Sequence, residues 1–390
     1  MAAIVFVLSV GTILYTYIVY PALLAALARL WSRPVHTAVH TPTVTLLIAA
    51  YNEEETIAQK IENSLALDYP PEHLQILVAA DGSADRTAPL VAAYAHQNVV
   101  LNYEPARRGK MAAINRAMPR ATGEIVVFSD ANNFYQADAL RELVKPFADA
   151  SVGAASGAKI IAKGDGVLGE SEGLYWRYES FIKEKETAVH SSVGVAGEIL
   201  AIRRHLFEPP PDDIINDDFY IAARLLHRGY RVVYVPAARS IERISPTAQD
   251  EMARRARIVA GRYQAIWRSR ELLPWKRPLL TWQIVSHKFL RPLVPLAMIA
   301  AWAANLVLAF RARPLARLLF LLQMGFYATA VLGACFQPGG RLGKLLYLPT
   351  YLVTSNLAAL LGLGRFLAGK QTTRWQRVPR RQSAIQSEKQ

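Results

Sequence analysis

The chain has 390 residues, enough for one large domain or two ordinary ones, and 45 Lys+Arg against 31 Asp+Glu give a formal net charge of +14. A basic chain suits nucleic acid, anionic lipid or phosphate-bearing substrates, but a positive mean hydropathy of +0.14 and long uncharged runs favour the membrane over nucleic acid. The single cysteine, Cys335, excludes an internal disulfide, and its apolar surroundings predict a buried side chain without a chemical role.

The amino-terminal run from Met1 to Ala28 carries no charged side chain. At about 1.5 Å per residue it is long enough for a hydrocarbon core of roughly 30 Å. A signal peptide would begin with basic residues and have a shorter apolar region, whereas here Arg29 and Arg33 follow the run. We therefore predict a transmembrane anchor over residues 1–32, with its amino end outside and the following residues in the cytoplasm.

Residues 41–270 have the composition of a soluble domain in which short apolar runs alternate with helical periodicity. Alternating strands and helices predict an α/β domain with a doubly wound, mostly parallel sheet. The predicted strands are Val44–Ala50, Gln75–Ala80, Val99–Tyr103 and Glu124–Ser129. The predicted helices between and after them are Glu53–Ala66, Ala84–His96 and Lys110–Met118.

Two of these strands end on an aspartate, Asp81 and Asp130, and Asn132 follows two residues after the second. Ligands of open α/β sheets bind outside the carboxyl ends of the strands, so both aspartates are predicted to face one crevice. Oxygens of Asp130 and Asn132 suit a hard cation such as Mg²⁺ or Mn²⁺. The basic turn Arg107–Lys110 at the same edge suits a diphosphate. The alternative for Asp130 is an Asx turn that closes a strand.

A second acidic pair, Asp217 and Asp218, precedes a predicted helix at Phe219–His227. Taken alone, the pair is better explained as acidic residues at a helix amino terminus, which they stabilise. The alternative is a general base, because adjacent carboxylates repel and this raises the pKa of one of them.

The carboxyl-terminal part returns to membrane character. The mixture of Trp, Lys, Arg and Leu over residues 275–290 predicts an amphipathic helix lying in the membrane interface, with an ordinary core helix as the alternative. Residues 291–367 contain three uncharged runs and are predicted to form membrane helices, followed by a basic tail at 368–390. Three spans would put this tail outside, against the positive-inside bias, so one run, most plausibly the last, need not cross the bilayer.

Several of these segments together resemble the inverting family 2 glycosyltransferases, which have the GT-A fold. The resemblance covers roughly residues 43–262. With the terminal spans, it extends to the membrane-embedded synthases of cellulose, hyaluronan and poly-N-acetylglucosamine. The motifs that carry it are Ala49–Glu53, Ala80–Thr87, Gly109-Lys110 with Ile114-Asn115, Ser129–Asn132, and Asn216–Phe219 followed by Arg224–Val232.

The resemblance implies a role for each matching residue. Asp218 is the expected general base, with Asp217 as its orienter, and Asp130 and Asn132 are the expected ligands of Mg²⁺ or Mn²⁺. Gly197 and Glu198 lie where an acceptor loop is expected, although a plain turn is an equal alternative. The residues expected to bind the nucleotide-sugar donor are Ala50, Tyr51, Glu53, Asp81, Lys110, Asp130, Arg254 and Arg257.

The sequence departs from the family pattern at two places. Asn132 stands where many members have a second aspartate, which implies weaker intrinsic metal binding. Arg254 and Arg257-Ile258 replace the Gln-x-x-Arg-Trp motif, and the missing tryptophan puts processive synthesis in doubt. Trp267 and Trp375 are conceivable substitutes, although an anchoring role at the membrane interface suits either of them.

Our sequence-based hypothesis is a metal-assisted, inverting, multi-pass enzyme of the cell inner membrane with a cytoplasmic catalytic domain. It would move a sugar from a UDP-sugar to a growing extracellular or capsular polysaccharide, in contact with membrane lipid and with export partner proteins but without nucleic acid. One alternative is a non-processive transferase that adds a single sugar to a lipid-linked acceptor. The other is an inactive nucleotide-sugar-binding subunit, against which the intact Asp81, Asp130 and Asp218 argue.

Overall fold

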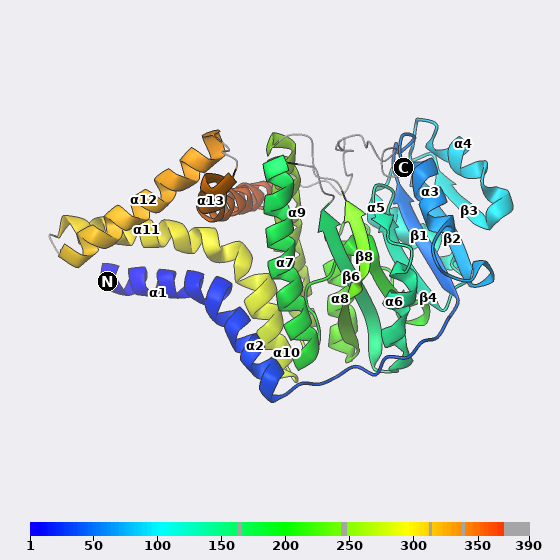
Figure 1. Cartoon of the computed structure of the whole chain (residues 1–390), viewed down its shortest axis with the longest axis horizontal. Coiled ribbons are helices and arrows are strands. Elements are labelled where there is room, and N and C mark those ends of the chain that lie inside the picture. The colour runs from blue at the N-terminus through cyan, green and yellow to red at the C-terminus, as the bar shows by residue number, and fades with distance from the viewer. Residues whose placement is uncertain (162–165, 243–247, 312–313, 337–339, 370–390) are drawn as a thin grey trace.

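The computed structural model describes residues 1–161, 166–242, 248–311, 314–336 and 340–369 (Figure 1). Trp375 and most of the predicted basic tail lie outside the described residues. In Figure 1 the sheet occupies one end of the molecule, the apolar terminal helices occupy the other, and helices α7 and α9 stand between them.

The described residues contain one eight-stranded sheet in the order β3-β2-β1-β4-β7-β6-β8-β5. Strands β3, β2, β1 and β4 are parallel, whereas β7 is antiparallel to both of its neighbours. The predicted parallel sheet is thus correct for the first four strands, and the whole sheet is mixed. The strands are β1 (Val44–Ala50), β2 (Leu74–Asp81), β3 (Val99–Glu104), β4 (Ile125–Asp130), β5 (Phe134–Tyr135), β6 (Val152–Ile161), β7 (Leu200–Arg203) and β8 (Arg231–Glu242).

Helices cover both faces of the sheet, as predicted for a doubly wound domain. Ile57 and Leu143 pack on one face, and Met111 and Leu226 pack on the other. Every residue of β1 is buried, which explains why its sequence is an unbroken apolar run. The helices of this part are α3 (Ile57–Leu65), α4 (Thr87–Ala92), α5 (Lys110–Ala117), α6 (Ala139–Val144), α7 (Gly166–Val189), α8 (Asp217–Arg228) and α9 (Ala248–Ser269).

The predicted strand bounds agree with the structure to within one residue, but α3 and α4 begin three or four residues later than predicted. The reason is that motif residues form hydrogen-bonded turns before each helix. Asn52 adopts a left-handed φ of 51°, and the side chain of Asp85 accepts the N–H of Thr87 at 3.0 Å. These turns bring polar groups to the carboxyl edge of the sheet.

Four helical stretches are long and apolar enough to cross a membrane: Ala2–Leu30, Pro278–Phe310, Pro314–Phe336 and Leu346–Leu367. The side chain of Cys335 on α12 is exposed, so the predicted burial of this residue is wrong. A helix face that meets lipid is apolar without being covered by protein. The helices are α1 (Ala2–Leu14), α2 (Tyr20–Leu30), α10 (Pro278–Ile284), α11 (Val294–Phe310), α12 (Pro314–Phe336) and α13 (Gly340–Leu367), with π-helical segments at Tyr15–Val19 and Val285–Phe289.

Helix α13 packs along α9 rather than standing apart from the α/β domain. A Cβ on Gly362 would lie 2.9 Å from the carbonyl oxygen of Ala256, which shows how closely the two helices approach. Further along, the ring of Phe366 stacks on that of Tyr263, with centroids 6.1 Å apart. The last apolar run is therefore held against a helix that is continuous with the soluble domain.

The predicted interfacial helix corresponds to α10 and its π-helical continuation. Trp275 before it is 70% exposed, while the indole N–H of Trp282 donates to the hydroxyl of Tyr15 at 2.7 Å. One side of this segment thus packs on the amino-terminal helix. Its position in the membrane interface stays a prediction.

Candidate active site

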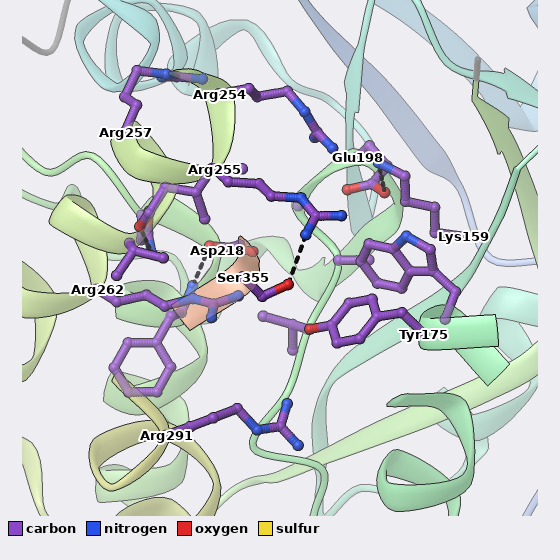
Figure 2. A pocket seen from close by; sticks show the side chains of 18 of the residues that line it. Lys159, Tyr175, Glu198, Asp218, Arg254, Arg255, Arg257, Arg262, Arg291 and Ser355 are labelled. Atoms are coloured by element: carbon purple, nitrogen blue, oxygen red, sulfur yellow. Dashed lines mark hydrogen bonds and ion pairs between the residues drawn. The ribbon is translucent and has the colours of Figure 1, made fainter. Parts of the chain in front are cut away.

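A cavity of about 870 Å³ opens at the carboxyl edge of β1 and β4 and continues between α7, α9 and α13 (Figure 2). It gathers residues from motifs far apart in the sequence. Of the residues assigned to the site from the sequence, those that line it are Glu53, Lys110, Asp130, Asn132, Gly197, Glu198, Asp217, Asp218, Arg254 and Arg257.

The two loops that follow β1 and β2 are tied to each other by hydrogen bonds. The side-chain oxygen of Asn52 accepts the N–H of Ala84 at 2.9 Å, and the N–H of Glu53 donates to the hydroxyl of Thr87 at 2.8 Å. These bonds fix the position of Glu53 at the cavity. The first two motifs are therefore one structural unit.

Ala50, Tyr51 and Asp81 are near this edge but do not line the cavity. Ala50 is buried within β1, and the guanidinium of Arg107 lies 3.7 Å from the centre of the Tyr51 ring. Gly82 lets the Arg107 segment approach: its φ is +65°, and a Cβ there would lie 2.5 Å from the Cβ of Arg107.

Asp81 is completely buried, and its carboxylate faces the basic turn instead of the open cavity. Oδ2 accepts the backbone N–H groups of Arg108 at 3.0 Å and Gly109 at 2.7 Å. The guanidinium of Arg116 lies 3.6 Å from the other oxygen. Asp81 and Asp130 end at the same edge of the sheet, but the prediction that both face one crevice is wrong for Asp81, since only Asp130 lines the cavity.

Lys110 links the acidic motifs at the centre of the site. Its ammonium lies 2.9 Å from Asp130 Oδ1 and 3.3 Å from Asp217 Oδ2. Burial by itself would lower the pKa of Lys110, but the two carboxylates more than offset it and hold the pKa above its ordinary value. Lys110 is therefore a permanent positive charge between Asp130 and Asp217.

Asp130 and Asn132 fit a hard divalent cation by the chemistry of their oxygens. The described residues contain no group of three or more His, Cys, Asp or Glu side chains that could hold a metal. Any metal here would therefore take one carboxylate and one amide oxygen from the protein and its remaining ligands from water and a bound diphosphate. Mg²⁺ sites of this open kind are common.

Asp218 lies at the start of α8, where its Oδ1 accepts the N–H of Phe219 at 2.7 Å. Burial raises the pKa of Asp218 to about 6 and the adjacent Asp217 adds to the rise, while Lys288, this N–H and Lys110 oppose it. The absence of a side chain at Gly197 makes room for Asp218, since a Cβ there would lie 3.1 Å from the Cβ of Asp218. A carboxylate with this pKa is suited to accept a proton near neutral pH.

Further along the cavity, Glu198 and Lys159 face each other beside aromatic side chains. Lys159 Nζ lies 3.6 Å from Glu198 Oε1, forms a closer ion pair with Glu242, and lies 5.2 Å from the centre of the Trp176 ring. The aromatic residues Tyr175, Trp176 and Tyr178 also line the cavity, where stacking on a sugar ring is available to them.

The α9 face that borders the cavity contains more than the predicted Arg254 and Arg257. Ile258, which stands in place of the family's tryptophan, lines it as well, and so do Arg255 and Arg262. Arg255 donates to the hydroxyl of Ser355 on α13 at 2.8 Å. Sequence analysis missed both arginines. The basic residues that recur at helical spacing before the apolar carboxyl-terminal runs were a pattern from which they could have been predicted.

The wall of the cavity near the membrane helices was also missed. Arg291 forms an ion pair with Glu179 of α7, and His287 lies between Glu179 at 3.1 Å and Glu186 at 2.7 Å. Lys288 and Arg291 line the cavity. These contacts join segments more than 100 residues apart, and no local pattern in the sequence marks them.

A mixed α/β sheet that places a lysine between two acidic motifs, beside a buried carboxylate with a raised pKa, is the arrangement expected of a glycosyltransferase. Residues 42–261 match the family described as Glycosyltransferase like family 2. The match covers more than half of the chain, and the chain belongs to this family.

Two curated relatives show the range of the family. Poly-beta-1,6-N-acetyl-D-glucosamine synthase of Staphylococcus aureus (strain COL) is 28% identical over 231 residues, 58% of this chain and 56% of that protein. Beta-monoglucosyldiacylglycerol synthase of Synechocystis sp. is 25% identical over 281 residues, 68% of this chain and 59% of that protein. The alignments thus span between half and two thirds of these relatives.

Among solved structures, mannosyltransferase PcManGT from Pyrobaculum calidifontis, in complex with GDP-Man and Mn²⁺, has a TM-score of 0.72 at 24% identity. The likeness covers 94% of this chain and 100% of that one. It confirms the GT-A fold and extends over the terminal helices as well as the catalytic domain.

Proposed function

We propose that the protein is a membrane-embedded, inverting glycosyltransferase that moves a sugar from a UDP-sugar to an acceptor hydroxyl at the cytoplasmic face of the membrane. The observation that carries this proposal is the continuity of the large cavity described above. The cavity extends from Lys110 and Asp130 at the sheet edge, past Asp218, to Tyr17 and Tyr351 on the apolar terminal helices. Donor and acceptor can thus meet at one carboxylate.

Asp218 takes the proton of the acceptor hydroxyl as its oxygen attacks the anomeric carbon of the donor. The bond from that carbon to the diphosphate oxygen breaks, and the nucleoside diphosphate leaves with the bonding electrons. One direct displacement inverts the anomeric carbon and requires no covalent enzyme intermediate. General-base catalysis of this kind typically contributes roughly 10²–10⁴-fold.

The leaving diphosphate requires positive charge beside it, and Lys110 supplies a fixed ammonium at this place. Mg²⁺ or Mn²⁺ held by Asp130 and Asn132 would add neutralisation of the leaving group when bound. The Mn²⁺ in the mannosyltransferase complex supports this assignment. Asp81 contributes by holding the turn that carries Lys110, since it accepts the N–H groups of Arg108 and Gly109.

Tyr51, Glu53, Arg254 and Arg257 remain our candidates for contacts to the nucleotide, and Gly197 and Glu198 for contacts to the acceptor. Our assignment of uracil as the base of the donor nucleotide depends on the resemblance to enzymes that use UDP-sugars. The mannosyltransferase of similar fold, in contrast, is in complex with GDP-Man. A donor screen therefore has to include both nucleotides.

For the acceptor, extension of a polysaccharide is supported by the similarity to the poly-N-acetylglucosamine synthase. A second candidate, addition of a single sugar to a lipid-linked acceptor, is favoured by Ile258. This residue lines the cavity where a processive enzyme of the family is expected to have tryptophan. The similarity to beta-monoglucosyldiacylglycerol synthase supports the same candidate.

For the membrane arrangement, we propose that the helical stretch Ala2–Leu30, α11 and α12 span the bilayer and that α13 lies along its cytoplasmic surface. The packing of α13 on α9 at Gly362 and Phe366 supports this, because a helix held along the catalytic domain does not also cross the bilayer. The basic tail then stays on the cytoplasmic side, which satisfies the positive-inside bias.

The test incubates membranes containing the protein with radiolabelled UDP- and GDP-sugars and follows the label into lipid-extractable and polymeric products. We expect transfer by the wild-type protein and its loss in Asp218→Asn. Transfer undiminished in Asp218→Asn would refute the role of this base, and no transfer from any donor would refute the function. The length of the product separates polymer extension from single addition.

A further inference from the structure

Four cationic side chains surround the part of the cavity between Asp218 and the terminal helices. Arg255 and Arg262 come from α9, Lys288 from the π-helical segment before α11, and Arg291 from the turn that follows it. Figure 2 shows the guanidinium groups of Arg255, Arg262 and Arg291 pointing into the same space, around Asp218 and Tyr175.

Protein groups satisfy three of these cations, Arg262, Lys288 and Arg291, only in part. Within the described residues, Arg262 has no hydrogen bond or ion pair, and Lys288 has only the ring of Phe219, 5.7 Å away. Arg291 pairs with Glu179 through Nη1, which leaves its buried Nε and Nη2 without a hydrogen-bond acceptor. Buried unpaired donors are costly and rare in native proteins, so this arrangement indicates that an anion completes it.

The acidic residues of the cavity are engaged elsewhere. Asp130 and Asp217 share the ammonium of Lys110, and Glu198 and Glu242 face Lys159. Asp218 lies beside the cluster but has to remain available to accept a proton. The four cations are therefore distinct from Lys110, whose charge Asp130 and Asp217 already balance.

The place of this site in the fold indicates where its ligand comes from. Its walls include Ser355 and Tyr351 of α13 and Tyr17 of the amino-terminal helix, and Ser355 and Tyr351 contact Arg255 directly. These residues belong to the apolar stretches that would contact lipid. Cations beside such stretches are suited to the phosphate groups of membrane lipids.

We propose that Arg255, Arg262, Lys288 and Arg291 bind the phosphate of a lipid-linked acceptor, so that the hydroxyl of its sugar reaches Asp218. This inference rests on the proposed transferase function and defines the acceptor for it. The acceptor phosphate is bound and does not react. Its arginine contacts orient the acceptor between the membrane and the donor, as planar guanidinium groups do for phosphate.

The experiment measures ligand binding to the full-length protein in nonionic detergent by native mass spectrometry. The probes are a polyprenyl phosphate, the polyprenol of equal length, and a soluble hexose 1-phosphate. Arg262→Gln is the main variant because Arg262 has no protein partner whose loss would disturb folding. Arg268→Gln is the matched control, since Arg268 lies on the same helix but pairs with Asp213 outside the cavity. Binding of UDP and of GDP is measured on every sample.

We expect the wild-type protein to bind polyprenyl phosphate at least 10-fold more tightly than polyprenol. The substitution Arg262→Gln should weaken the binding of polyprenyl phosphate by about 10- to 100-fold, which corresponds to the loss of one charged hydrogen bond. The Arg268→Gln variant should bind polyprenyl phosphate as tightly as the wild type, and the binding of UDP and of GDP should be the same in all samples. If hexose 1-phosphate binds as tightly as polyprenyl phosphate and Arg262→Gln abolishes this binding, the site binds phosphate but serves a soluble acceptor. That result would overturn the assignment to a lipid-linked acceptor. Equal binding of polyprenol and polyprenyl phosphate, or wild-type binding by Arg262→Gln, overturns the proposal. Absence of both UDP and GDP binding by the wild type would instead count against the transferase function.

Discussion

Gly197 and Asp218 are packed so closely that a Cβ on the glycine would lie 3.1 Å from the Cβ of the aspartate and 3.5 Å from its Oδ2. The loop before β7 thereby sets the position of the carboxylate that we assign as base. The carboxylate of Asp218 also accepts the N–H of Phe219 at the start of α8, so its side chain has little room to move away from Gly197.

Gly197→Ala should therefore displace Asp218 and lower kcat by about 10- to 100-fold, since misplacement of a catalytic group by about 1 Å is that costly. The donor KM should change little, because Lys110 and Asp130 are not touched. Steady-state kinetics on purified protein measure both. Gly173→Ala is the matched control, as a Cβ there meets nothing within 4 Å. Equal kcat values for the two variants would contradict the assignment.

The pKa of Asp218, raised by burial and by Asp217 to about 6, predicts the acid limb of the pH profile. A base has to be deprotonated, so kcat/KM should be constant above this pKa and fall tenfold per pH unit below it. The profile of kcat/KM reports the free enzyme, to which this pKa applies. Asp218→Asn should reduce the rate by roughly 10²–10⁴-fold and abolish this limb. A limb that persists in Asp218→Asn would assign it to another group.

Asp217→Asn should move the acid limb to lower pH. The change removes a negative charge next to Asp218, so less work is needed to ionise the remaining carboxylate. Asp213→Asn serves as control, because this carboxylate pairs with Arg268 outside the cavity and should leave the profile unchanged. A shift of the limb to higher pH in Asp217→Asn would show that Asp217 acts mainly through Lys110.

Replacing the ligands of the proposed cation site should change metal affinity in opposite directions. Asn132→Asp adds a negative charge and should tighten Mn²⁺ binding in the presence of UDP, whereas Asn132→Ala should raise the metal concentration needed for activity. Asp130→Ala should abolish binding and transfer. Titration of free Mn²⁺ by electron paramagnetic resonance measures affinity independently of turnover. Asp138→Ala, an exposed aspartate outside the cavity, is the control. Full activity in Asp130→Ala would exclude the site.

The carboxyl terminus is predicted to lie on the same side of the membrane as the catalytic domain. A fluorescent protein that folds only in the cytoplasm, fused after Gly369, should be bright, and a periplasmic phosphatase fused there should be inactive. A phosphatase fused after α11, in the connection to α12, should be active and serves as the positive control. The reverse pattern would mean that α13 crosses the bilayer in spite of its packing on α9.

Much of the fold could be predicted because its signals are local. The strand Val44–Ala50 is an apolar run of the right length, and all of it is buried in the structure. The predicted starts of α3 and α4 were too early, because the side chains of Asn52 and Asp85 form turns with hydrogen bonds to backbone groups that a longer helix would use. The antiparallel strand β7 was not anticipated, since four residues, Leu200–Arg203, are too few to give a periodic signal.

The candidate site likewise has a part that could be predicted from local sequence and a part that could not. The sequence by itself determined the residue types at the donor edge, because Lys110, Asp130 and Asp218 lie in motifs whose order and spacing are distinctive. It did not determine that Asp81 turns away from the cavity to hold the basic turn, or that Lys110 connects two acidic motifs 87 positions apart, Asp130 and Asp217. Such contacts depend on how strands and helices are placed in three dimensions.

Only the tertiary structure decided the membrane side of the cavity. Arg262, Lys288 and Arg291 are ordinary basic residues in the sequence, next to apolar segments where basic residues are common. They become a cluster because α9, the segment before α11, and α13 pack around one space. Basic residues that look ordinary along the chain form a candidate binding site because packing brings them together and leaves some of their hydrogen-bond donors unpaired.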